Sequence, residues 1–164
     1  LVGSEMCIRD RMITENGPKV VEFNVRFGDP ECQVLMPLLE SDPLELMYDA
    51  ACGRLDPSKV KIADGFAAVV VMCARGYPGK YAKGDEISLP ESVPAGSQII
   101  HAGTRREGGK ILTAGGRVLG LSGFGKTLEE ALARAYALAD SVKFDGGFFR
   151  RDIAHRELER RATK

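Results

Sequence analysis

Residues 20–33 read VVEFNVRFGDPECQ, and this stretch decides which fold the chain can form. Apolar and polar residues alternate along its first half, as in a β-strand whose two faces meet different surroundings. One face carries Glu22, Asn24 and Arg26, and the other carries Val21, Phe23, Val25 and Phe27. We therefore predict a strand that presents a carboxylate, an amide and a guanidinium at alternate positions of one face.

The polar face of this strand is suited to binding a metal ion and a phosphate. The Glu22 carboxylate and the Asn24 amide oxygen form a pair of hard-oxygen ligands, the kind that Mg²⁺ prefers. The guanidinium of Arg26 suits a phosphate or a developing oxyanion. The simpler alternative is a half-exposed strand with a polar outer face. The order of residues disfavours it, because exposed faces usually mix Thr, Lys, Ser and Glu.

A turn is expected directly after the strand. Gly28-Asp29-Pro30 consists of residue types that favour turns. Asp29 and Glu31 follow the metal-binding strand at its far end, which makes them candidate substrate-binding residues. Capping of a following helix remains an alternative role for both.

The same segment resembles a known enzyme family. Glu22-x-Asn24-x-Arg26 is similar to the metal-binding strand of ATP-grasp ligases, and residues 26–33 resemble the signature of the phosphoribosylamine–glycine ligase family. The resemblance extends over about residues 12–158. Further matching segments follow in the expected order at residues 76–79, 101–104, 115–119, 144–146 and 150–153.

The resemblance implies an activity and a role for each candidate residue. The family joins glycine to 5-phosphoribosylamine, consumes ATP and passes through glycyl phosphate, a step in de novo purine biosynthesis. By position in the motif, Glu22 and Asn24 would hold Mg²⁺ or Mn²⁺ on the ATP phosphates. Arg26 would be the catalytic residue that stabilises the transferring phosphoryl group, and Asp29 and Glu31 would bind substrate.

The resemblance also implies that part of the enzyme is missing. The family carries its adenine pocket, glycine-rich loop and phosphate-binding lysines upstream of this motif, so no ATP-binding residue beyond the metal strand is assigned here. We therefore expect the chain alone to be inactive, with the N-terminal part of the same enzyme as its partner.

Composition narrows the class of protein. The chain has 164 residues, of which 44% are hydrophobic and 28% charged, as in ordinary globular proteins. The 23 basic and 23 acidic residues balance, which gives no support for nucleic acid or an anionic membrane as partner. Four cysteines without a C-x-x-C pair argue against zinc and disulfides. Together with the lack of a membrane-length apolar run, this predicts a cytoplasmic protein.

We predict an α+β fold with two domains and a non-native beginning. Residues 1–11 (LVGSEMCIRDR) lack the apolar core of a signal peptide and differ from the resembled family, so we expect them to be foreign sequence. Residues 12–58 would be the C-terminal end of an ATP-grasp domain. Residues 59–164 would form a C-terminal antiparallel β-sandwich or barrel-like domain covered by a helix.

The first predicted domain contains a hairpin and a helix. Asn16-Gly17 is a hairpin turn signal between arms at residues 12–14 and 19–27. A short helix or coil follows and is interrupted at Pro37. Asp42 is a helix cap, with Pro43 at the first helical position and Glu45 completing a capping box; Gly53 would end this helix.

The second predicted domain contains short strands and one long helix. Apolar runs separated by glycine-rich turns predict strands at residues 60–62, 66–74, 86–88, 97–102, 110–113 and 117–122. Gly115-Gly116 would join the last two in a tight hairpin. Thr127 caps a helix whose apolar stripe should cover the sheet. Phenylalanines near residue 148 would anchor the chain end, and residues 156–164 would fray.

A phosphate-binding P-loop is an alternative interpretation of residues 120–127, GLSGFGKT. This run matches G-x-x-x-x-G-K-[ST] between a predicted strand and a predicted helix. The surrounding strands favour antiparallel hairpins, whereas a P-loop requires a parallel sheet. We therefore expect a glycine turn that leads into a capped helix, with Lys126 away from any phosphate.

Other candidates have simple structural alternatives. His101 could act as a base, His155 could pair with Asp152, and Tyr77 and Tyr81 could contact substrate from a Gly-Pro loop. The alternative for His101 is a structural histidine at a strand end. His155 lies in a charged tail, and the tyrosine loop could be simply a packed turn. A non-catalytic, protein-binding β-sandwich is the remaining alternative for the chain as a whole.

Overall fold

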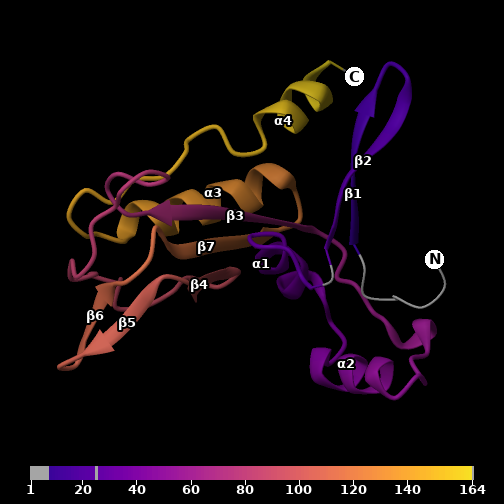
Figure 1. Cartoon of the computed structure of the whole chain (residues 1–164), viewed down its shortest axis with the longest axis horizontal. Coiled ribbons are helices and arrows are strands. Elements are labelled where there is room, and N and C mark those ends of the chain that lie inside the picture. The colour runs from indigo at the N-terminus through magenta and orange to yellow at the C-terminus, as the bar shows by residue number, and fades with distance from the viewer. Residues whose placement is uncertain (1–7, 25, 164) are drawn as a thin grey trace. The chain divides into compact units, whose positions relative to one another are not determined.

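The computed structural model describes residues 8–24 and 26–163, with the backbone alone for residues 8–13 and 21–24. The chain divides into two compact units, residues 1–32 and residues 33–164. Figure 1 shows the elements of both units along the chain. Among the described residues, no helix combines the length and the apolar character needed to cross a bilayer.

The first unit is built on the predicted hairpin. β1 (Ile8–Thr14) pairs antiparallel with β2 (Gly17–Asn24), and the chain turns at residues 15–16. Gly17 has a φ of +84°, a backbone conformation that glycine adopts without steric cost. β1 begins at Ile8, so it includes part of the segment expected to be foreign; its origin stays a prediction.

Short helices open the second unit. α1 (Cys32–Leu35) runs into a 3₁₀ turn, η1 (Met36–Leu38), because Pro37 cannot continue the α-helical hydrogen bonds. α2 (Pro43–Ala51) begins as predicted, with Asp42 Oδ1 accepting a hydrogen bond from the Leu44 amide at 2.8 Å. It ends before Gly53, whose φ is +67°. A second 3₁₀ turn, η2 (Pro57–Lys59), follows.

The main sheet of the second unit has three antiparallel strands. β3 (Phe66–Cys73) and β4 (Ser97–His101) flank β7 (Arg117–Gly125) in the order β3-β7-β4. β5 (Thr104–Glu107) and β6 (Lys110–Thr113) form a separate two-stranded sheet. The predicted α+β class is confirmed, but the sheets are open, and the described residues form no closed barrel.

The hairpin predicted at Gly115-Gly116 is wrong. β6 pairs with β5 across Gly108 and Gly109, and β7 pairs with β3 and β4. The amides of Ala114 and Gly115 donate instead to the Gly103 carbonyl, at 2.8 and 3.0 Å. A side chain on Gly103 would meet the Gly115 backbone within 3 Å, so these glycines permit two loops to touch. β5 was not predicted, because its residues are mostly polar and exposed and give no apolar run.

The predicted strands at residues 60–62 and 86–88 are reduced to isolated backbone bridges. Ile62 pairs with Leu39, Glu86 with Leu112, and Ser88 with Lys143. The partners in each bridge are more than 20 residues apart in sequence, so these runs do not form hairpins with adjacent segments.

One helix covers the main sheet, as predicted. α3 (Leu128–Ser141) packs on β3 and β7, and Figure 1 shows it lying along these strands. Its stripe of buried residues comprises Leu128, Ala131, Leu132, Ala135, Leu138 and Ala139, and it packs against core residues of the sheet such as Val70, Leu119 and Leu121. The Thr127 hydroxyl accepts from the Glu130 amide at 3.1 Å, and the Glu130 carboxylate accepts from the Lys126 amide at 2.8 Å.

The chain end is anchored, as predicted for the phenylalanines, but its last segment is a helix. Phe144 and Phe149 pack on the core, and the Phe148 backbone pairs with Cys73. Residues 156–164 were expected to fray. Among the described ones, the structure instead has the helix α4 (His155–Ala162). Leu158 of α4 packs on the cluster around Leu128, which supplies the tertiary contact that a short polar helix needs.

Candidate functional site

The strand predicted to bind metal is β2, and its backbone pairing with β1 is defined. Glu22 lies opposite Asp10 and Asn24 opposite Ile8. The register shifts between Asp10 and Arg11, so β2 carries one extra residue at Val21, as in a β-bulge. The side chains of Glu22 and Asn24 lie outside the described residues, and their metal-binding role stays a prediction.

The segment after β2 presents three charged residues to solvent. Arg26, Asp29 and Glu31 are all exposed, within the first unit. Arg26 Nη1 donates to the carbonyl of Phe27 at 2.8 Å. These observations do not test the predicted roles. Catalysis by Arg26 and substrate binding by Asp29 and Glu31 therefore stay predictions.

A buried glycine shapes the turn between these residues. The Gly28 carbonyl accepts from the Cys32 amide at 3.0 Å, and the Glu31 carboxylate lies against the Gly28 Cα. A side chain at position 28 would displace the Glu31 carboxyl group, whose carbon lies 2.8 Å from the place a Cβ would take. The Asp29–Pro30 peptide bond is cis. The sequence thus places Glu31 over the turn by leaving position 28 without a side chain.

The P-loop interpretation does not fit the structure. Residues 120–125 are not a loop but the second half of β7, an antiparallel strand. Gly123 and Gly125 allow this strand to approach α3, since a Cβ on Gly123 would lie 2.6 Å from the Ala135 amide nitrogen. Lys126 Nζ donates to the Asp64 carbonyl at 3.2 Å. The glycines of this motif therefore serve strand–helix packing.

The two histidines have structural partners. His101 Nδ1 lies 3.0 Å from the Thr104 hydroxyl, at the turn between β4 and β5. His155 Nδ1 lies 2.8 Å from the backbone carbonyl of Asp152, not from its carboxylate. That carboxylate is held by Arg150 through two hydrogen bonds of 2.9 and 2.6 Å, which lower the pKa of Asp152 to about 2.

The tyrosines of the Gly-Pro loop form a packed turn. The Tyr77 and Tyr81 rings lie 6.4 Å apart and are tilted by 56°. Both rings face Gly116, where any side chain would collide with Tyr77. The packing of these rings explains why residue 116 is a glycine. A contact between either ring and a substrate stays a prediction.

A polar hollow lies beside the start of α2. It has a volume of about 330 Å³ and is lined by Glu40, Ser41, Asp42, Glu45, Leu46, Lys59 and Lys61. The Ser41 hydroxyl donates to the Lys59 carbonyl at 2.7 Å and accepts from the Lys61 amide at 2.8 Å. Both signs of charge line the hollow, so it favours no single class of ligand.

Sequence reasoning missed one feature of the second unit. α2 presents its apolar residues to solvent, including Leu44 at 75% exposure and Tyr48 at 59%. Their helical spacing is visible in the sequence, but spacing alone predicts that such a stripe is buried.

Two family models match the chain. "Phosphoribosylglycinamide synthetase, ATP-grasp (A) domain" matches residues 7–32. "Phosphoribosylglycinamide synthetase, C domain" matches residues 67–156. The interval between the matches contains the domain boundary predicted near residue 58, which stays a prediction.

Individual relatives agree with these matches. A phosphoribosylamine–glycine ligase of Rhizobium meliloti is 50% identical over 149 residues, covering 91% of this chain and 35% of that protein. A crystal structure of phosphoribosylamine–glycine ligase from Thermotoga maritima superposes with a TM-score of 0.76 at 40% identity, covering 88% of this chain and 35% of that one. The chain thus spans about a third of the length of these relatives.

A more distant structure shares the fold alone. The biotin carboxylase domain of Hydrogenobacter thermophilus 2-oxoglutarate carboxylase superposes with a TM-score of 0.59 at 17% identity, covering 85% of this chain and 31% of that one. The fold and the matched segments place the chain in the ATP-grasp class. More closely, it belongs to the phosphoribosylglycinamide synthetase family.

Proposed function

We propose that this chain is the C-terminal part of a phosphoribosylamine–glycine ligase, which joins glycine to 5-phosphoribosylamine with ATP and yields glycinamide ribonucleotide, ADP and phosphate. One observation supports this above others. Two domain models of a single enzyme family match one chain, and the ATP-grasp match ends on the segment at residues 26–32 that carries the charged turn. The reaction would activate the glycine carboxylate as glycyl phosphate before the amine displaces phosphate.

The residues of the first unit have the chemistry that this role needs. A carboxylate and an amide oxygen at Glu22 and Asn24 fit a hard divalent ion such as Mg²⁺ or Mn²⁺. That ion, when bound, would neutralise negative charge on the phosphates of ATP. The exposed Arg26 can donate hydrogen bonds to the transferring phosphoryl group. The exposed carboxylates of Asp29 and Glu31 can accept hydrogen bonds from the amino groups of the substrates.

The proposal requires the upstream part of the enzyme. The family relatives are about three times as long as the matched region, so the chain alone would lack the adenine pocket and turn over no substrate. We place the enzyme in the cytoplasm, which agrees with free thiols at Cys32, Cys52 and Cys73.

A fusion tests the proposal. The chain would be joined to the upstream two thirds of the Rhizobium meliloti relative, and glycinamide ribonucleotide formation would be measured with Mg²⁺ and ATP. We expect product from the fusion and none from the chain alone. Glu22→Ala in the fusion should lower the rate at least 100-fold, on the order of a lost charge-stabilising group.

Lys126→Ala is the control, because the Lys126 side chain lies in the second unit and its Nζ donates to the backbone carbonyl of Asp64. It should leave the rate within about twofold. Full activity of the Glu22→Ala fusion, or product formation by the isolated chain, would overturn the proposal. Loss of nucleotide binding in Lys126→Ala alone would restore the P-loop interpretation.

A further inference from the structure

One face of β7 carries a buried hydroxyl that packing against α3 does not explain. Successive residues of a strand point to opposite faces of the sheet, and Gly123 lies against α3. Gly120 and Ser122 therefore face the other side. Ser122 is 2% exposed, on a strand whose other buried residues are apolar or glycine.

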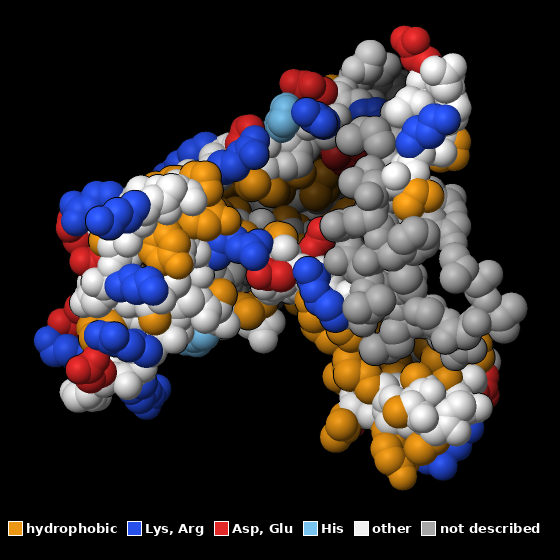
Figure 2. All heavy atoms as spheres, in the orientation of Figure 1, with side chains coloured by type: hydrophobic (Ala, Val, Ile, Leu, Met, Phe, Trp, Pro, Cys, Tyr) orange, Lys and Arg blue, Asp and Glu red, His pale blue; other side chains and the backbone are white. Residues whose placement is uncertain are grey.

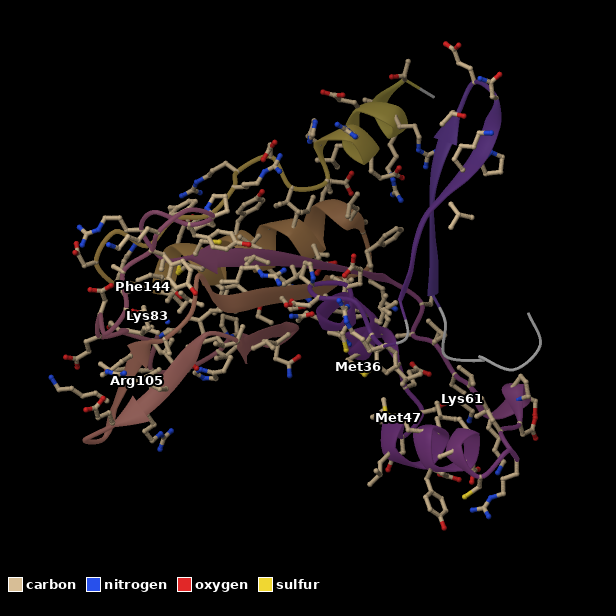
Figure 3. The ribbon with its side chains drawn as sticks, in the orientation of Figure 1. Met36, Met47, Lys61, Lys83, Arg105 and Phe144 are labelled. Atoms are coloured by element: carbon tan, nitrogen blue, oxygen red, sulfur yellow. The ribbon has the colours of Figure 1, made fainter. Side chains whose placement is uncertain are left out.

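The segment that follows the charged turn lies on this second face. Gln33 Cγ is 3.7 Å from the place that a Cβ on Gly120 would take, and η1 contacts β3. The Ser122 hydroxyl donates to the Gln33 carbonyl at 3.4 Å, which joins residues 89 positions apart in the sequence. Met36, labelled in Figure 3, marks the position of this segment.

Pro37 removes the helical donor for the Gln33 carbonyl. In an α-helix, this carbonyl would accept a hydrogen bond from the amide of the residue four positions along. That residue is Pro37, which has no N–H to donate. The Ser122 hydroxyl supplies a donor from the sheet instead, near the point where α1 passes into η1.

A buried contact of this kind constrains the chain more than surface charges do. On the face shown in Figure 2, basic and acidic side chains are interspersed over the second unit, and exposed ion pairs contribute little. A polar group removed from water must keep its hydrogen-bond partner, because the unmade bond there costs the full desolvation of the group. The contact between Ser122 and Gln33 therefore favours one position of Gln33.

We propose that Ser122 is a positioning residue for the ligase reaction, because it holds Gln33 and so fixes the end of the charged turn at residues 26–31. This rests on the proposed function, since that turn is the candidate site. Gln33 follows Cys32 directly, and the Cys32 amide donates to the Gly28 carbonyl at 3.0 Å. A shift of Gln33 is therefore passed along a short stretch of backbone to the turn. A small displacement of reacting groups lowers the rate of transfer.

Removal of the hydroxyl tests the proposal in the fusion described above. Ser122→Ala should lower kcat for glycinamide ribonucleotide formation about tenfold and leave the KM for ATP within about twofold, because the adenine pocket lies upstream. Thr113→Val is the matched control. Thr113 is also buried, but it lies in the separate sheet of β5 and β6, where its hydroxyl accepts from the Asp85 amide at 3.0 Å. The control should lower the melting temperature by a similar amount and leave kcat within about twofold.

Two rescue variants separate positioning from a general loss of packing. Ser122→Thr keeps the hydroxyl and should return kcat to within about threefold of the unmodified fusion. Pro37→Ala, added to Ser122→Ala, supplies an amide donor at position 37 and should recover kcat likewise. Recovery by either route supports the proposal. Equal loss of kcat in Ser122→Ala and Thr113→Val, or no recovery in either rescue, would overturn it.

Hydrogen exchange separates this proposal from the proposed function. In the chain alone, Ser122→Ala should speed exchange of the amides at residues 28–35 by about fivefold or more, with Thr113→Val unchanged. Unchanged exchange in Ser122→Ala would show that Ser122 does not hold the turn. An unmodified fusion that forms no product would refute the proposed function, whereas faster exchange would keep the contact with Gln33. Full activity of Ser122→Ala in an active fusion would do the reverse.

Discussion

Two leucines of the second unit should respond very differently to the same substitution. Leu138 on α3 is 2% exposed and packs in the core, whereas Leu44 on α2 is 75% exposed. Leu→Ala removes three carbons from each. The comparison therefore measures burial with the chemistry held constant.

The magnitudes follow from burial. At Leu138, three buried carbons contribute about 2.4 kcal/mol of transfer free energy, and the cavity left behind adds to this. We expect a loss of about 3 kcal/mol in the free energy of unfolding, or roughly 10 °C in melting temperature. At Leu44 the same change should cost within about 0.5 kcal/mol, as at ordinary surface sites.

Urea denaturation followed by circular dichroism measures both values on the chain alone. The midpoint should shift for Leu138→Ala with little change in slope. Equal losses at the two positions would refute the reasoning, because Leu44 would then have to be buried. A loss at Leu44 that grows with protein concentration would point to self-association through α2.

Three further outcomes are expected. Gly123→Ala should destabilise the chain by more than about 2 kcal/mol, since its Cβ would meet the Ala135 backbone, while exposed Gly79→Ala should cost far less; equal melting curves would contradict this packing. Asp42→Ala should cost about 1 kcal/mol through loss of the α2 cap, visible as reduced helicity, and an unchanged spectrum would exclude the cap. Arg150 lowers the pKa of the Asp152 carboxyl from its ordinary 3.8 to about 2, so this ion pair stabilises the chain end fully above about pH 4 and is lost as the pH falls towards 2. Limited proteolysis should therefore show the chain end becoming more accessible between about pH 4 and 2, and constant protection over that interval would refute the role of the ion pair.

Local patterns in the sequence were sufficient for several elements. The alternation along residues 20–27 predicted a strand, which the structure has at Gly17–Asn24, and Asp42, Thr127 and Gly53 correctly marked helix ends. The helix after Thr127 and the packing of its apolar stripe on the sheet were also predicted. These features depend on periodicity and capping, which act over a few residues and can be read without tertiary contacts.

Strand pairing could not be read this way. β5 is polar and was missed, and the partner of β6 was assigned wrongly, because pairing depends on which distant segment lies alongside. α4 was expected to fray, yet Leu158 packs on the Leu128 cluster and the Arg161 guanidinium lies 4.7 Å from the Phe66 ring centre. Such contacts join residues far apart in sequence.

The sequence alone determined the family, through the run around Arg26 and Gly28, and the residue types available for metal and phosphate chemistry. Only the tertiary structure decided that residues 120–125 are an antiparallel strand packed on α3, and that Leu44, Met47 and Tyr48 of α2 face solvent. The reason is physical. A motif specifies which groups are present, whereas burial and backbone approach are properties of the folded chain and arise from contacts that no local pattern encodes.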